Sequence, residues 1–483
     1  MPSATAVAPA RTRRLADVPS PPGLPLLGQA LSLRPLRLAR QLEDWGRELG
    51  MPYRLKLGPR QILIFDDPEA MQTLLRGRPR SVRRNRTFEP VFAEMGIAGV
   101  FSSEGEAWQE QRRLVMQALN PSHFRAFHPT LQAITERLQR RWEAAADEGR
   151  TLQMTEELVR YTVDVTSTLA FGEDPNTLER DDDVIQRHLA AVFPMIMKRV
   201  MAPWPYWRHL RLPADRRLER DLAAVHAYAH RTIERARRRL AIEQPAEPRH
   251  ALEAMLMMAD QASSGFTDVT IVANVITLLL AGEDTTAHSL AWTLYFLAQD
   301  ERLQDRLHDE ARAALGDAAG CPHHDALRRL DLFEALASEA LRLKPVIPVF
   351  GTSLLEPAQI GDVALPAGSD AMYLARPALT SERHFSNAER YDPWRWLRGA
   401  ADGTVHDTRA FLQFGAGPRV CPGRHLATVE LRLVLSMLLR HFRIELMCRP
   451  EDVEEVTAFT MMPSRIPVRL HRRRAAPRSH PHS

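Results

Sequence analysis

Cysteine is scarce in this chain of 483 residues, which has three, Cys321, Cys421 and Cys448. An odd number at wide spacing excludes a disulfide framework and favours a reducing compartment, so we expect a cytoplasmic protein. Lysine is equally rare, and arginine therefore carries most of the positive charge. With a net charge of only +4 and dispersed arginines, the composition excludes a nucleic-acid-binding protein.

Long apolar runs are also missing. No stretch reaches the ~18–20 consecutive apolar residues that a membrane-spanning helix needs. The most apolar run, ITLLLAG at 276–282, ends directly at Glu283 and Asp284. We therefore expect no membrane anchor. No internal repeat or Gly/Ser linker divides the chain, which predicts a single domain over 20–470 between disordered tails at 1–19 and 471–483.

Helical patterns dominate what is present. The run over 267–299 opens with a Thr-Asp cap and stays largely apolar, which predicts a long helix through the middle of a domain. Further helices are predicted at 108–119, 129–145, 214–240, 301–315, 332–343 and 427–440. Strand patterns occur only at 53–67 and 347–374. The sequence thus predicts a mainly α fold, a large helical domain with a small β subdomain built from an early and a late segment.

Cys421 lies in the stretch FLQFGAGPRVCPGRHLA, 411–427. Gly415 and Gly417 permit tight turns, and Gly423 leaves room for a flat group close to the backbone. Backbone N–H groups at the start of the following helix favour a thiolate over a thiol. Arg419, two residues earlier, suits the carboxylate of a ligand. The alternative from composition alone is an inert cysteine in a glycine-rich turn.

The pattern F-G-x-G-x-R-x-C-x-G, from Phe414 to Gly423, resembles the haem-ligand loop of the cytochrome P450 superfamily. This resemblance implies a P450 fold and haem b (iron protoporphyrin IX) as cofactor. It implies that Cys421 is the axial thiolate, whose electron donation favours O–O cleavage. It further implies that Arg419 binds a haem propionate and that Phe414 packs beside the sulfur.

AGEDTT, 281–286, resembles the oxygen-activation motif of the same superfamily. The helical period places Ala281 or Gly282 on one face with Thr285, where small residues leave a gap. The resemblance implies that O2 fits this gap, that Thr285 donates a hydrogen bond there, and that Asp284 relays protons from solvent. A helix N-cap is the other interpretation of DTT, but apolar sequence continues on both sides.

EALR at 339–342 places Glu339 and Arg342 at i and i+3. It resembles the family's E-x-x-R pair, which fixes the proximal side of the haem. Arg395, in DPWRWL, would be the third member of this ionic network, although Trp394 stands where relatives commonly have an acid.

EAWQEQRR, 106–113, resembles the family's W-x-x-x-R helix, in which Trp108 and Arg112 contact a propionate. Where many relatives have another propionate-binding arginine, this chain has Thr352. Only Arg419, Arg112 and Trp108 are therefore predicted to meet the propionates.

The implied function is a soluble, bacterial-type haem-thiolate monooxygenase that uses O2 to hydroxylate or epoxidise a small apolar substrate. Electrons would come from NAD(P)H through a ferredoxin or flavodoxin-type donor and its reductase, docking near Arg112, Arg113 and Arg424. Segments predicted to line the substrate pocket are 88–101, 192–207, 346–350 and 458–462. Alternatives are a peroxide-driven or non-oxygenating member of the fold and a haem-binding sensor without turnover.

Overall fold

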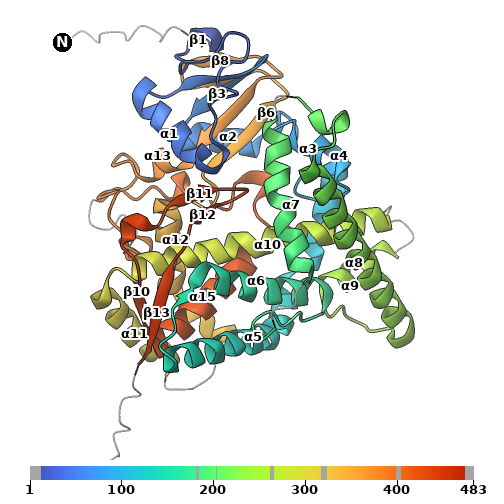
Figure 1. The fold of residues 1–483 in the computed structure, drawn as a ribbon, viewed down its shortest axis with the longest axis vertical. Coiled ribbons are helices and arrows are strands. Elements are labelled where there is room, and N and C mark those ends of the chain that lie inside the picture. The colour runs from blue at the N-terminus through green and yellow to red at the C-terminus, as the bar shows by residue number, and fades with distance from the viewer. Residues whose placement is uncertain are drawn as a thin grey trace, which may run out of the picture.

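The computed structural model describes residues 12–180, 184–202, 204–260, 266–316, 324–398 and 404–473. The mainly helical fold with a small β region is confirmed. Helix α10, Asp268–Leu297, crosses the middle of the molecule (Figure 1). It packs on α6, Met154–Phe171, and α12, Asp331–Leu343. The close approach to α6 needs a glycine, because a Cβ on Gly282 would lie 2.7 Å from the Thr166 hydroxyl.

The remaining helices surround α10 or cover the sheets. They are α1 (Leu38–Leu49), α2 (Pro68–Arg76), α3 (Phe88–Glu94), α4 (Gly105–Ala118), α5 (Pro121–Asp147), α7 (Val184–Met201), α8 (Pro213–Glu243), α9 (Ala251–Ala259), α11 (Glu301–Leu315), α13 (Ala375–Leu379), α14 (Arg395–Arg398) and α15 (Arg424–His441). Helix α11 begins and ends where the sequence predicts. Helix α5 begins earlier than predicted and continues through Pro129, because the apolar face it buries extends on both sides of the proline.

A five-stranded sheet joins segments that are far apart in sequence. Its order is β2 (Tyr53–Leu57), β3 (Arg60–Phe65), β9 (Asp370–Leu374), β6 (Val349–Leu354) and β4 (Val82–Arg84). Strands β2 and β3 form the predicted hairpin, and β3 pairs in parallel with β9 from Ile62↔Asp370 to Phe65↔Tyr373. The early and late β segments therefore meet in one sheet, as the sequence predicts.

The smaller sheets use strands from both ends of the described chain. They are β1 (Arg13–Arg14) with β8 (Val363–Leu365) and β7 (Ala358–Ile360); β10 (Phe442–Leu446) with β13 (Pro467–Arg472) and β5 (Leu152–Gln153); and β11 (Glu455–Thr457) with β12 (Met461–Pro463).

Order begins earlier and ends later than predicted. Arg13 pairs with Asp362 at 2.8 Å, and strand β13 continues to Arg472. The predicted tail boundaries at 19 and 471 are therefore wrong, since strand pairing holds residues 13–14 and 471–472. Residues 1–11 and 474–483 lie outside the described chain.

Helix α10 is long and apolar enough, by length and composition, to cross a membrane. In this structure the apolar side chains of α10 belong to the core, because most of them are buried against neighbouring helices. It is the core helix of the fold.

Candidate active site

The Cys421 loop connects a short 3-10 turn, Gly417–Arg419, to helix α15. Gly417 has a φ of +68°, and a Cβ there would lie 2.6 Å from the Leu75 carbonyl oxygen. The Cys421 N–H donates to the Phe414 carbonyl at 2.8 Å. These contacts fix the backbone that holds the sulfur, and Gly423 forms the N-cap of α15 directly after it.

The surroundings of Cys421 act on the pKa of its thiol in opposite directions. Burial raises the pKa of the thiol, whereas the backbone N–H groups of Gly423 and Arg424 and the charge of Arg112 lower it. The net direction is upward, although the N–H groups lower the pKa of Cys421 as the sequence predicts. The cause is desolvation, and a cation bound to the sulfur would reverse it.

Ala281 marks an opening in the middle of α10. It is exposed, although Leu280 before it and Glu283 after it are buried. The Thr285 hydroxyl, one turn later, donates to the Ala281 carbonyl at 2.8 Å. Of the two small residues that the motif offers, Ala281 therefore shares a face with Thr285, whereas Gly282 packs on Thr166 of α6. The opening is in the place where the resemblance puts the bound oxygen.

Asp284 has no hydrogen-bond partner among the described residues. Burial raises its pKa from 3.8 to about 6. A carboxyl that titrates near neutral pH can both hold and release a proton under working conditions. Asp284 is thus suited to a relay, and it directly precedes the hydroxyl of Thr285.

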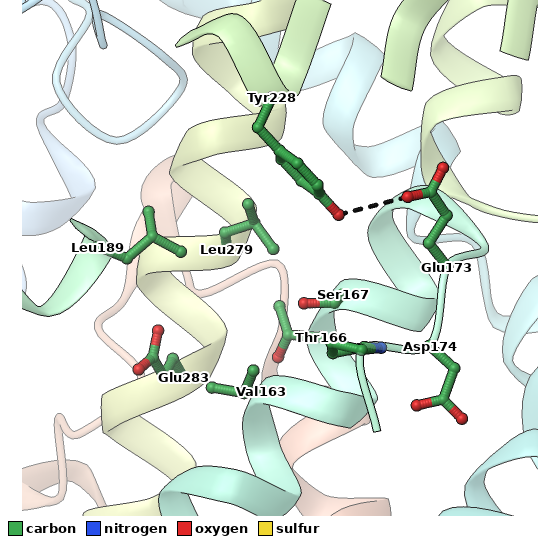
Figure 2. A pocket seen from close by; sticks show the side chains of 10 residues that line it. Val163, Thr166, Ser167, Glu173, Asp174, Leu189, Tyr228, Leu279 and Glu283 are labelled. Carbon is green, nitrogen blue, oxygen red and sulfur yellow. Dashed lines mark hydrogen bonds between the residues drawn. The ribbon is translucent and has the colours of Figure 1, made fainter. Parts of the chain in front are cut away.

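A cavity of about 220 Å³ lies beside this part of α10 (Figure 2). Its lining comes from α6, α7, α8, α10 and the segment after α6: Val163, Thr166, Ser167, Glu173, Asp174, Pro175, Leu189, Tyr228, Leu279 and Glu283. The Tyr228 hydroxyl donates to Glu173 at 3.5 Å, and the buried Thr166 hydroxyl has no partner in the described chain. These polar groups in a largely apolar wall can bind water beside Glu283, the residue before Asp284.

Arg419 is held at one end only. Its Nη2 donates to the Ser103 carbonyl at 2.6 Å and to Glu104 at 2.7 Å, and its guanidinium lies 4.4 Å from the ring centre of Trp108. Its Nε and Nη1 are buried without a partner in the described chain. Burial lowers the pKa of Arg419 to about 10. The predicted neighbours Arg419 and Trp108 are therefore brought together around an unsatisfied cation.

Two further arginines join this cluster and were missed from the sequence. Arg84 and Arg78 both have a buried Nε without a partner among the described residues. Burial, with repulsion from Arg419, lowers the pKa of Arg78 to about 10 and that of Arg84 well below its ordinary range. The arginine-rich run 76–86 was the available signal, but only the fold shows which of its guanidinium groups turn inward.

Arg84 also supplies the positive charge that Thr352 lacks. Strand β4 pairs antiparallel with β6, and Arg84 lies directly opposite Thr352. Its backbone N–H donates to Glu104 at 3.0 Å, and its guanidinium lies 4.0 Å from the ring centre of Phe101. Arg84 of β4 thus places a positive charge beside Thr352 of β6, the position at which many relatives have an arginine.

Arg112 follows Trp108 by one turn of α4. Burial lowers its pKa, and the charge of Cys421 raises it. Arg112 therefore lies within electrostatic reach of the sulfur. Phe414, on the other side of the loop, is covered by the Arg424 guanidinium at 5.5 Å from its ring centre.

These residues fit an iron porphyrin. Three buried guanidinium groups, Arg78, Arg84 and Arg419, share the carboxylate of Glu104, because Glu89, which also reaches Arg419, is paired with Arg83. Buried positive charge is left over and needs an anionic partner. The carboxylates of haem supply such charge. Cys421 supplies a sulfur ligand, and the opening at Ala281 supplies space.

Glu339, Arg342 and Arg395 form one buried network. Glu339 Oε1 lies 2.9 Å from Arg342 Nη2 and 2.9 Å from Arg395 Nε. Trp396, which the sequence did not suggest, donates its Nε1–H to Glu339 Oε2 at 2.9 Å. Arg342 also donates to backbone carbonyls, including that of Leu379 at 2.6 Å. The unusual Trp394 therefore does not displace Arg395 from the network.

A second cavity, of about 100 Å³, brings together the four segments predicted to line a substrate pocket. Its lining includes one side chain or more from each: Phe88 on α3, Met197 on α7, Ile347 before β6 and Phe459 between β11 and β12. The ring of Phe459 lies 4.8 Å from that of Phe193. The surface is mainly apolar, with Arg60, Asn85, Thr87 and Thr457 as its polar members.

His288 anchors this aromatic loop and was not predicted to do so. It is buried on α10, and its Nδ1 lies 3.0 Å from the Thr460 hydroxyl. Burial lowers the pKa of His288 to about 4, so the ring is neutral near pH 7. The contact fixes the residue next to Phe459.

The family model for cytochrome P450 matches residues 18–470. Similar curated proteins include the chloroplastic protein LUTEIN DEFICIENT 5 of Arabidopsis thaliana, 26% identical over 85% of this chain and 70% of the relative. They also include the mitochondrial 25-hydroxyvitamin D-1 alpha hydroxylase of Homo sapiens, 27% identical over 94% of this chain and 92% of the relative. Cytochrome P450 2S1 of Homo sapiens is 27% identical over 90% of this chain and 87% of the relative.

Proposed function

Because this chain belongs to the cytochrome P450 family and is a P450 monooxygenase, we propose that it inserts one oxygen atom from O2 into a small apolar substrate by hydroxylation or epoxidation. The observation that carries this proposal is the pair Asp284–Thr285. Asp284 is a half-buried carboxyl with a pKa of about 6, and Thr285 carries its hydroxyl beside the opening at Ala281. A peroxide-driven enzyme, a non-oxygenating isomerase or a haem sensor has no need of such a relay.

Haem bound through Cys421 would supply the binding and activation of O2. Arg84, Arg112 and Arg419 would hold its propionates, with Trp108 packed on Arg419. The carboxyl of Asp284 holds a proton, and Thr285 Oγ passes one into the opening after rotating away from the Ala281 carbonyl. The apolar walls keep other water out of the site.

An apolar substrate is supported by the lining of the second cavity. Its methionine and phenylalanine side chains would give such a substrate uncharged contact area. They are Met197, Met201, Phe88 and Phe459. Met372 adds a third flexible side chain from strand β9.

We assign the electron supply to a ferredoxin or flavodoxin-type protein with its reductase, fed by NAD(P)H. Arg113 and Arg424 are exposed on the two elements that flank the sulfur, and neither forms an ion pair with a described residue. Together with Arg112 they present positive charge to an acidic carrier. Two thiols, Cys421 and Cys448, are free in the described chain, which supports a cytoplasmic, reducing location.

The test is a carbon monoxide difference spectrum of the reduced protein, followed by turnover with a ferredoxin system and a panel of fatty acids, terpenoids and aromatics. A thiolate-type spectrum with oxygenated product supports the proposal. A thiolate-type spectrum without any O2-dependent product, or with product only from hydrogen peroxide, favours the alternatives.

Replacing Thr285 by alanine should uncouple the reaction. The share of NAD(P)H electrons released as hydrogen peroxide is expected to rise several-fold, because no hydroxyl then delivers protons at the opening. Coupling should also fall as the pH rises through about 6 in the unmodified protein, since Asp284 loses its proton in that range. Peroxide and product are measured against NAD(P)H consumed.

The matched control for this relay is Thr293→Ala. Thr293 makes the same bond to the preceding turn of α10, at 2.8 Å to the Ser289 carbonyl, but lies two turns away. Its loss should leave coupling unchanged. Equal coupling in Thr285→Ala and the unmodified protein would contradict the relay, as would a pH profile unaltered by Asp284→Asn.

Replacing Arg84 by glutamine should loosen the cofactor. Loss of one charge-assisted hydrogen bond costs about 1.5–3 kcal/mol, which corresponds to roughly tenfold or more in haem retention. The measurement is the rate of haem transfer to excess apomyoglobin, which needs no turnover. Arg80→Gln is the control, because Arg80 belongs to the same arginine-rich run but is exposed. Equal transfer rates for the two variants would exclude Arg84 as a propionate ligand.

A further inference from the structure

The cavity of about 220 Å³ lies on the side of α10 that faces α6 (Figure 2). Leu279 and Glu283, four residues apart, line it, whereas Ala281 and Thr285 border the opening on another face of the helix. No residue of its lining belongs to the lining of the second cavity. A molecule bound here is therefore a second ligand, separate from the apolar substrate. We call this space the acidic cavity.

The charge of the acidic cavity has one sign, with three acids and no basic side chain in its lining. Glu173 and Asp174 are 33% and 38% exposed, which places them at the rim. Two arginines outside the lining compensate in part, since Arg235 lies 2.9 Å from Glu173 and Arg137 lies 2.6 Å from Asp174. Arg137 also lies 3.4 Å from the buried Asp164, so two carboxylates share one positive charge. The cavity therefore favours a cation.

Hydroxyl groups of α6 lie beside these acids, and one of them points to a ligand. Thr166 lines the cavity and is 5% exposed, yet its Oγ1 has no hydrogen-bond partner in the described chain. Leaving a buried hydroxyl unpaired costs free energy, so a group from outside the chain is expected to pair with it. Ser167, the next residue, adds a second hydroxyl to the lining. Figure 2 shows Thr166 between Glu283 on one side and Asp174 on the other.

The remaining walls of the acidic cavity exclude a simple metal site. Among the described residues, no three acids, histidines or cysteines come close enough together to hold a metal ion. Four lining side chains are apolar and offer such an ion nothing: Val163, Pro175, Leu189 and Leu279. They suit a cation that carries hydrocarbon. The volume lies below the ~300–1,000 Å³ of pockets for drug-sized molecules, which limits that hydrocarbon to a short chain.

We propose that the acidic cavity is a binding site for a small primary alkylammonium ion, a second ligand of this protein. The ammonium group has three N–H donors, and the carboxylate of Glu173 with the hydroxyl oxygens of Thr166 and Ser167 supplies three acceptors. The hydrocarbon chain lies against Leu189 and Leu279, where it leaves water. Binding needs the cavity alone and no oxygen transfer, so it does not rest on the proposed function.

The test is calorimetric titration of the holoprotein with n-butylammonium chloride near neutral pH, where an alkylammonium, like lysine, keeps its proton. Saturable binding of one ion is expected, with the haem absorption spectrum unchanged. Butan-1-ol has the same chain without the charge and should bind at least tenfold more weakly. A shift of the haem spectrum on binding would place the amine on the iron or in the second cavity and overturn the proposal. Equal binding of potassium ions would overturn it in favour of an inorganic cation.

Variants locate the ion in the acidic cavity. Glu173→Gln should weaken n-butylammonium binding by about tenfold and Thr166→Val by about fivefold, since each removes one acceptor. If Thr166→Val does not fold, because Gly282 packs closely on Thr166, Ser167→Ala replaces it with the same expected effect. Glu234→Gln is the control, since Glu234 also pairs with an arginine, on the exposed face of α8, and lies outside the lining. No saturable binding, or equal affinity of the Glu173 and Glu234 variants, overturns the proposal.

Discussion

A Cys421→Ala variant is expected to lose the thiolate-type carbon monoxide spectrum completely and, with it, oxygen-dependent turnover. The sulfur is the only side-chain ligand that the loop presents, and its donation to iron is what favours O–O cleavage. Because burial raises the pKa of the free thiol, the thiolate depends on the metal it binds. The loss should therefore be of the whole signal and not a partial decrease.

Cys448→Ala is the control for this result. Cys448 is the other free cysteine of the described chain, half-buried after strand β10, and its removal should leave the spectrum intact. Absorption is read on protein reconstituted with hemin, so that a poor supply of haem during expression is not mistaken for a lost ligand. A thiolate-type spectrum that persists in Cys421→Ala would refute the ligand assignment.

Glu339→Gln is expected to destabilise the folded protein severely. It leaves the guanidinium groups of Arg342 and Arg395 buried without their counter-charge, and breaking a buried ion pair in this way costs about 3–5 kcal/mol. That is a large part of the ~5–15 kcal/mol by which folded proteins are stable. The free energy of unfolding in urea gives the value, and a low yield of haem-loaded protein is the outcome if folding fails.

If Glu339→Gln does not fold, the contribution of this network to stability can still be measured with Trp396→Phe. It removes one hydrogen bond to Glu339 Oε2 and should cost about 1.5–3 kcal/mol. Glu310→Gln is the surface control, since its pair with Arg306 is exposed and worth about 1 kcal/mol or less. Equal stability of the Glu310 and Trp396 variants would show that the network is not a buried electrostatic unit.

The local motifs could be predicted because each one acts within a few residues. Glu339 and Arg342 face each other because residues at i and i+3 of a helix do so, and Gly417 marks a left-handed turn that a side chain would obstruct. The fold class followed from helical periodicity, which needs no knowledge of contacts. The tail boundaries failed because short strands such as β1 carry little signal without their partner strand.

The arginine cluster could not be predicted in this way. Arg84 and Arg83 are adjacent and identical in type, yet one guanidinium is buried beside Arg419 and the other pairs with Glu89. Strand alternation separates them, and the pairing of β4 with β6 places Arg84 opposite Thr352. None of this has a local pattern in the sequence. The same holds for His288, whose partner Thr460 is 172 positions away.

By itself, the sequence determined the helical class and predicted the sulfur ligand and the acid–hydroxyl pair, since each depends on residue type and short spacing. The tertiary structure alone decided which arginines lose their water and keep an unsatisfied charge, and which small residue is exposed on α10. The physical reason is that desolvation and exposure are properties of the packed chain. They arise from contacts between distant segments, and they have no value for any segment taken alone.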